Sequence, residues 1–118
     1  AHGLVGSEMC IRDRKINDAA LKINKLCPDL YIPHPREDER ILELLNENIT
    51  VVNCPNGSED FVNKLALNNE IEVFTEKSGI VFDLNKKIKI SFIDLFNRFS
   101  KSEYDKFKNQ YKEFKKSN

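Results

Sequence analysis

Short apolar runs alternate along this chain with stretches whose apolar residues recur at helical spacing. The strand-like runs are residues 29–33, 49–53 and 71–75. The helical stretches are residues 16–26, 37–48 and 59–67. Strands separated by helices favour a parallel sheet flanked by helices. We therefore expect an α/β fold with a Rossmann-like parallel sheet of the nucleotide-binding kind.

The C-terminal third extends this pattern with a segment that fits either a helix or a strand and with a further helix. Residues 80–84 fit either a helical turn or a strand, and residues 87–91 alternate like a strand without settling the assignment. The helix is expected at about residues 102–116. Its aromatic residues follow a 3, 4, 3 spacing and would form one face packed on the sheet, namely Tyr104, Phe107, Tyr111 and Phe114. The lysines between them would also suit a weak contact with anionic lipid.

Composition limits the classes of function. The 118 residues suffice for one small domain, and 19 basic residues balance 19 acidic ones, so the usual electrostatic signature of nucleic-acid binding is missing. Cys27 and Cys54 each precede a proline without metal-site spacing, which favours reduced thiols in an intracellular protein. No apolar run approaches the length of a membrane-spanning helix. We expect a cytoplasmic protein.

The first residues point to a different origin. The segment EMCIRDR, residues 8–14, back-translates codon by codon onto the end of a common sequencing adapter, and residue 1 is not methionine. We expect residues 1–14 to be translated adapter and disordered. The alternative is an ordinary disordered N-terminus. On the first interpretation, residues 15–118 are the domain and the natural protein is larger.

The segment YIPHPRE, residues 31–37, places His34 between Pro33 and Pro35 just after a strand-like run. Each proline restricts its own φ and disfavours helical backbone in the preceding residue, so this loop is stiff. An imidazole held there suits proton transfer or phosphate contact, since it can change its charge near neutral pH. A purely structural histidine is the competing interpretation. Arg36 would pair equally well with phosphate or with a carboxylate, either Asp38 or another one on the surface.

In open α/β sheets, ligands bind beyond the carboxyl ends of the strands, so residues that follow strands are the candidates. Glu59 would either favour a helix start through the helix dipole or hold the two hydroxyls of a ribose. Ser58 looks like an N-cap. Ser78 and Gly79 would form either an anion site at a helix start or an ordinary turn.

Several familiar motifs are missing from the sequence. It contains no GxGxxG, GxxxxGK[ST] or GxSxG and no metal-spaced set of cysteines or histidines, which disfavours the usual dinucleotide, kinase-like and hydrolase assignments. A phosphoryl-handling enzyme with His34 as nucleophile would lack a second histidine and a cluster of metal-binding carboxylates.

Residues 20–96 resemble the bacterial sialyltransferases of glycosyltransferase family 52, which act on lipooligosaccharide. YIPHPRE resembles the family's HP motif, and FTEKSGIVFDL at residues 74–84 resembles its serine motif, with Ser78 in the serine place. GSED at residues 57–60 resembles the acidic segment between them. The resemblance implies the C-terminal, donor-binding half of a GT-B enzyme that uses CMP-sialic acid without a metal or another cofactor.

The resemblance also implies roles for individual residues. His34 would be the general acid toward the departing CMP phosphate or its electrostatic stabiliser. Ser78 would contact that phosphate, Glu59 would hold the ribose hydroxyls, and the backbone from Tyr31 to Pro33 would flank the cytosine. The remaining donor-binding candidates are Pro35 and Gly79, with Arg36 as a further phosphate contact.

Two departures from the family bear on activity. Related enzymes often have two adjacent serines, whereas Lys77 precedes Ser78 here. The family's general base lies in an N-terminal domain that this sequence lacks, so we expect a fragment that transfers no sialic acid alone. The acceptor would bind through that missing domain. A homodimer of the full-length protein and a peripheral contact at the inner face of the bacterial cytoplasmic membrane are further expectations. The alternative is a non-catalytic α/β module for nucleotide binding or protein interaction.

Overall fold

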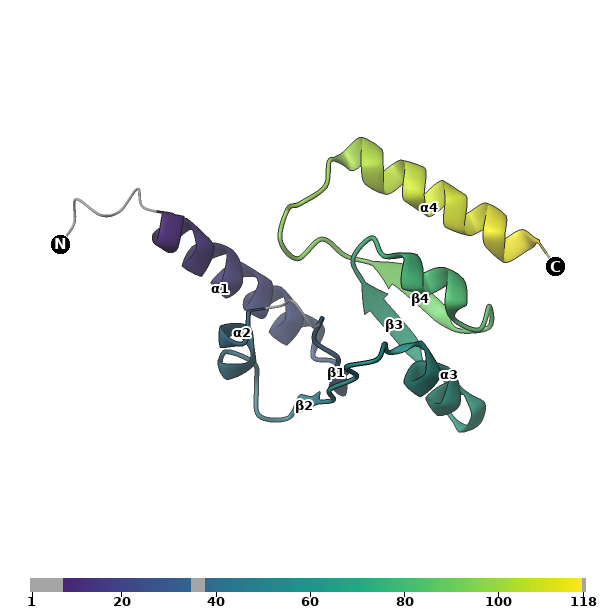
Figure 1. Ribbon diagram of the computed structural model, residues 1–118, viewed down its shortest axis with the longest axis horizontal. Helices are drawn as coiled ribbons and strands as arrows, with labels where there is room; N and C mark the ends of the chain where they lie inside the picture. Colours follow the sequence, from purple (N-terminus) through teal and green to yellow (C-terminus); the bar gives the residue numbers. More distant parts are fainter. Residues whose placement is uncertain (1–7, 35–37, 118) are drawn as a thin grey trace. The chain divides into compact units, whose positions relative to one another are not determined.

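The computed structural model describes residues 8–34 and 38–117, with side chains from residue 14 onward (Figure 1). Contacts divide the chain into two compact units, residues 1–55 and residues 56–118. We describe each unit by itself. No helix in the described ranges is long and apolar enough to cross a membrane.

Unit 1 begins with the helix α1, Glu8–Leu26. Its buried residues, Ile16, Ala19, Ala20 and Ile23, recur at the helical spacing that the sequence shows for residues 16–26, whereas Leu26 at the end of that stretch is exposed. The helix ends because Cys27 adopts a left-handed φ of 50° and is followed by proline, which cannot continue a helix. Residues 8–14, where we expected disorder, form the first turns of α1. Residues 1–7 lie outside the described residues.

The second helix of unit 1, α2, is Arg40–Glu43 and is much shorter than the expected 37–48. The side chain of Asn24, on α1, explains where it stops. Asn24 Nδ2 donates to the carbonyl oxygen of Leu44 at 3.0 Å, and its Oδ1 accepts from the N–H of Asn46 at 2.8 Å. Asn24, which is distant in sequence, therefore hydrogen-bonds two main-chain groups that would pair within the helix if α2 were longer.

Two short strands complete unit 1. The strand β1, Leu30–Tyr31, pairs in parallel with β2, Thr50–Val51. Flanking bonds extend the pairing, since the N–H of Val52 donates to the carbonyl oxygen of Tyr31 at 2.9 Å. The parallel pairing is the arrangement that the alternation of strands and helices predicts.

Unit 2 contains a second parallel pair with three helical elements. The helix α3 is Glu59–Asn68, the strand β3 is Glu72–Thr75, and the 3₁₀ helix η2 is Gly79–Asp83. The strand β4, Lys89–Phe92, pairs along its whole length with β3, and the chain continues into α4, Lys101–Lys116. The ambiguous segment at 80–84 is thus helical, and the alternating segment at 87–91 overlaps a strand.

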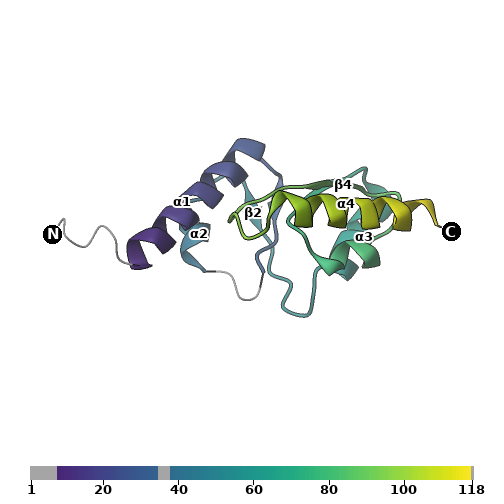
Figure 2. The same cartoon turned by 90° about the horizontal axis from the view of Figure 1, so that it is seen from above.

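The aromatic face of α4 builds the core of unit 2, as its spacing predicts. Val81 of η2, Phe107 and Tyr111 form the buried cluster. The partly buried residues packed against it are Ile80, Phe82, Ile90, Phe92 and Phe114. Several of these rings meet edge to face, an arrangement favoured by their quadrupoles. Figures 1 and 2 both show α4 running alongside β4.

The mixed α/β class and the parallel pairing are confirmed. The described strands form two separate two-stranded sheets, β1 with β2 and β3 with β4, and a Rossmann-like sheet stays a prediction. A strand of two residues, such as β2, offers few main-chain groups to a further strand, and both of its residues are exposed. Each sheet therefore consists of two strands from the same unit.

Candidate functional site

The loop that carries His34 leaves the end of β1. Tyr31, the last strand residue, is half-buried and has its carbonyl oxygen bonded to Val52, so the backbone entering the loop is anchored. Pro33 is half-buried and His34 is exposed. His34 therefore lies in the loop after a parallel strand, as predicted, and Ile32 and Pro33 separate it from the end of β1. Pro35 and Arg36 lie outside the described residues, and Asp38 forms an ion pair of 2.8 Å with Arg40.

Glu59 is the first residue of α3 and is half-buried. Its carboxylate folds back over Gly57, since a Cβ atom built on that glycine would lie 2.7 Å from Glu59 Oε2. Gly57 has a φ of 108°, which other residues rarely adopt. The turn before α3 thus needs a glycine both for its backbone and for the space that the carboxylate occupies.

Ser58 occupies the N-cap position of α3, but the predicted capping role is wrong. Its side chain makes no capping hydrogen bond, and its backbone is helical, with φ −98° and ψ −10°. An N-cap residue normally has extended backbone, which directs its oxygen toward the first free N–H groups. The side chain that can stabilise the N-terminus of α3 is therefore the neighbouring Glu59 carboxylate, because its negative charge is favourable at the positive end of the helix dipole.

Ser78 and Gly79 stand at the start of η2, between β3 and the core residue Val81. The half-buried Ser78 has extended backbone and its Oγ accepts the N–H of Ile80 at 3.4 Å. Gly79 is exposed, and a Cβ atom there would meet nothing within 4 Å. The predicted helix start is confirmed, and the serine oxygen acts as its cap. The open space above Gly79 leaves this turn accessible.

Tyr104, on α4, holds the loops that follow both strands of unit 2. Its hydroxyl donates to the carbonyl oxygen of Ile93, after β4, at 2.8 Å and accepts from the N–H of Lys77, after β3, at 3.4 Å. The sequence marks Tyr104 as a core residue, which is correct, but gives no sign of these two bonds. Lys77 Nζ lies over the ring of Phe99, 5.0 Å from its centroid, which further restrains the segment before Ser78.

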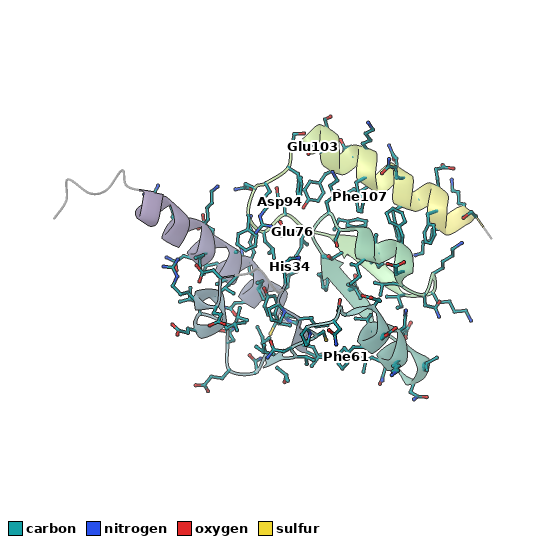
Figure 3. All side chains as sticks on the ribbon, viewed as in Figure 1. His34, Phe61, Glu76, Asp94, Glu103 and Phe107 are labelled. Atoms are coloured by element: carbon teal, nitrogen blue, oxygen red, sulfur yellow. The ribbon has the colours of Figure 1, made fainter. Side chains whose placement is uncertain are left out.

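These loops also contain two carboxylates that were not predicted as site residues, Glu76 and Asp94. Figure 3 labels both in the loops after β3 and β4. Glu76 Oε2 accepts the N–H of Leu95 at 3.3 Å, and Asp94 Oδ1 accepts the N–H of Asn97 at 2.8 Å. Burial raises the pKa of Tyr104, and the negative charges of Asp94 and Glu76 raise it further. Their position just beyond strand ends was the signal that could have identified them.

Glu76, Ser78 and Asp94 therefore lie on the two loops after β3 and β4, which the Tyr104 hydroxyl joins. His34 belongs to unit 1, whereas Glu59 and Ser78 belong to unit 2. A site that combines all three residues stays a prediction. In the described part of the chain, no group of three or more His, Cys, Asp or Glu side chains is placed to hold a metal ion.

Comparisons with models of protein families, with curated proteins and with solved structures find no match for this chain.

Proposed function

We propose that this chain is the donor-binding part of a sialyltransferase that transfers sialic acid from CMP-sialic acid to a terminal sugar of lipooligosaccharide. The proposal includes a Rossmann-like domain as the C-terminal half of a GT-B enzyme. The observation that carries it is the segment YIPHPRE, whose histidine lies in the loop that follows a strand in a parallel pair. Ligands of α/β proteins bind beyond such strand ends.

In this proposal His34 acts on the departing CMP phosphate. When the bond between sialic acid and phosphate breaks, the phosphate oxygen gains negative charge. An imidazolium can give that oxygen a proton or stabilise its charge. The exposed position of His34 on a loop entered through the anchored Tyr31 supports this role, because the ring is accessible while its backbone entry is held.

Glu59 and Ser78 would bind the rest of the nucleotide. The Glu59 carboxylate has two acceptor oxygens for the two hydroxyls of a ribose. Ser78 can donate its hydroxyl proton to a phosphate oxygen while its own oxygen accepts the N–H of Ile80, so the cap and the ligand contact are compatible. The unobstructed space at Gly79 supports close approach of a phosphate there.

The chain would bind the donor but transfer nothing alone. The acceptor hydroxyl needs a general base, which the proposal places in an additional N-terminal domain together with the acceptor contacts. Purified chain should therefore bind CMP while giving no sialylated product, and product formation by it alone would contradict this part of the proposal.

A titration of CMP, CDP and AMP against the full chain tests donor binding. The expected result is a preference for CMP over AMP that His34→Ala and Ser78→Ala each weaken by about tenfold or more, since each removes a hydrogen bond to a charged group. Matched controls are His2→Ala, in the N-terminal segment, and Ser102→Ala, in the first turn of α4. Equal binding of CMP and AMP, or equal affinities for all variants, would reject the proposal.

One observation favours a non-catalytic α/β interaction module as the second candidate. Ser78 already has a structural role as the cap of η2, and Lys77 stands where related sialyltransferases have a further serine. A chain whose circular dichroism shows folded helices but which binds none of the three nucleotides would support this alternative.

A further inference from the structure

Four lysines gather around an open hollow at the C-terminal end of α4. The lining residues are Lys86, Lys112, Lys115 and Lys116. Lys86 belongs to the segment between η2 and β4, and the other three belong to the last turns of α4. Figure 1 shows this end of α4 beside the turn that leads into β4. Two segments distant in sequence thus concentrate positive charge on one part of unit 2.

Two of these lysines are held in place by unit 2 itself. Lys86 Nζ donates to the carbonyl oxygen of Ser117 and lies over the ring of Phe114, 4.7 Å from its centroid. Lys115 Nζ lies 6.0 Å from the ring centroid of Tyr111. Ring faces attract cations, so these ammonium groups are partly ordered before any ligand arrives.

The charge of the hollow is not neutralised within the described part of the chain. Lys89 pairs with Glu72 and Arg40 pairs with Asp38, and none of the four lysines forms an ion pair with the described residues. Lys112 and Lys116 stand one turn apart, where like charges destabilise a helix. The helix dipole favours cations in the last turn of α4, but it does not explain why Lys86 joins them from another segment.

We propose that this lysine hollow is a docking surface for a membrane that contains anionic phospholipids. Lysine presents a compact point charge on a flexible stem, which suits the dispersed phosphates of a lipid surface. A nucleic-acid site would favour arginine forks and ring faces open to stacking bases, whereas Phe114 and Tyr111 have lysines over their faces here. Because 19 basic residues balance 19 acidic ones, the net charge would not attract the chain to an anionic membrane, and the attraction would come from the lysines of the hollow.

Flotation of the full chain with vesicles tests this docking surface. The chain is expected to float with vesicles of equal parts phosphatidylglycerol and phosphatidylcholine, not with phosphatidylcholine alone, and added salt should release it. The combined Lys112→Gln, Lys115→Gln and Lys116→Gln variant should lose about 100-fold in partitioning, because each lysine near an anionic surface contributes about fivefold. Glutamine preserves helix propensity, so α4 should remain folded.

The matched control removes three exposed lysines elsewhere, with the changes Lys25→Gln, Lys64→Gln and Lys101→Gln. It alters the net charge equally and should retain most of the binding. Equal losses in the two variants, or no binding to anionic vesicles, would overturn the proposal. Tighter binding to an oligonucleotide than to the anionic vesicles would overturn it as well. If the triple variant fails to fold by circular dichroism, Lys112→Gln alone decides the question, with an expected loss of about fivefold.

Discussion

The hydroxyl of Tyr104 donates a 2.8 Å hydrogen bond to the carbonyl oxygen of Ile93, in the loop that follows β4. Because the same oxygen accepts the N–H of Lys77, one side chain of α4 joins the loops after β3 and β4. The segment that carries Ser78 is therefore fixed by the C-terminal helix. In this way the packing of the helix determines the geometry of a candidate ligand-binding loop.

Tyr104→Phe should lower the free energy of unfolding by about 1–2 kcal/mol, because two main-chain groups lose their partner while the ring remains. Tyr111→Phe is the matched control. The two tyrosines are 7% and 6% exposed, but in the described residues the Tyr111 hydroxyl makes no hydrogen bond. Urea denaturation of both variants provides the measurement. Equal losses would show that the Tyr104 hydroxyl contributes nothing specific.

Alkaline pH should destabilise the fold through Tyr104 and Tyr111. Burial raises the pKa of both phenols above the ordinary value of 10.0. As the pH rises past that value, the unfolded phenols lose their protons before the folded ones do, so the unfolded state gains stability. The tyrosine contribution is thus fully present below about pH 10 and is lost as the pH rises through the folded pKa values.

Urea denaturation at about pH 9 and about pH 11 measures this loss. Lysines also titrate in this range, so the comparison uses a chain with both Tyr104→Phe and Tyr111→Phe. That chain should show a smaller fall in stability between the two pH values. An unchanged fall would assign the alkaline sensitivity to other groups.

The two serines at helix starts should differ in their importance for stability. Ser100 forms a capping box with Glu103, in which Ser100 Oγ accepts from the N–H of Glu103 at 3.2 Å and Glu103 Oε1 accepts from the N–H of Ser100 at 3.3 Å. Ser100→Ala should cost about 1 kcal/mol of unfolding free energy. Ser58→Ala should cost only a few tenths, since its side chain makes no cap bond. A larger loss at Ser58, by thermal or urea denaturation, would contradict the structure.

Two glycines near the candidate ligand-binding residues should also respond differently to alanine. Gly57→Ala should destabilise the chain by about 1 kcal/mol or more, since the backbone has a φ of 108° and the new methyl group would displace the Glu59 carboxylate. Gly79→Ala should change stability by less than about 0.5 kcal/mol because nothing lies near the added atom. Urea denaturation of the pair provides the comparison.

Local sequence patterns predicted many helices and strands because the formation of these elements depends on residues that are close in sequence. The buried stripe of α1 and the aromatic face of α4 follow from the 3.6-residue period of a helix. The end of α3 at Asn68 lies one residue beyond the predicted range of 59–67. For the candidate residues, sequence placed His34 after a strand and Ser78 at a helical start, as the structure does. It assigned no role to Glu76 or Asp94, although both lie just after strand ends and Glu76 belongs to the FTEKSGIVFDL segment.

The sequence by itself determined the alternation of helices and strands, the parallel pairing and the positions of the motifs that support the proposed function. Only the tertiary structure decided the short length of α2, the division of the strands into two sheets and the restraint of the Ser78 segment. The physical reason is the range of the interactions involved. Asn24 reaches the end of α2, and Tyr104 reaches Ile93 and Lys77, only after distant segments have packed together.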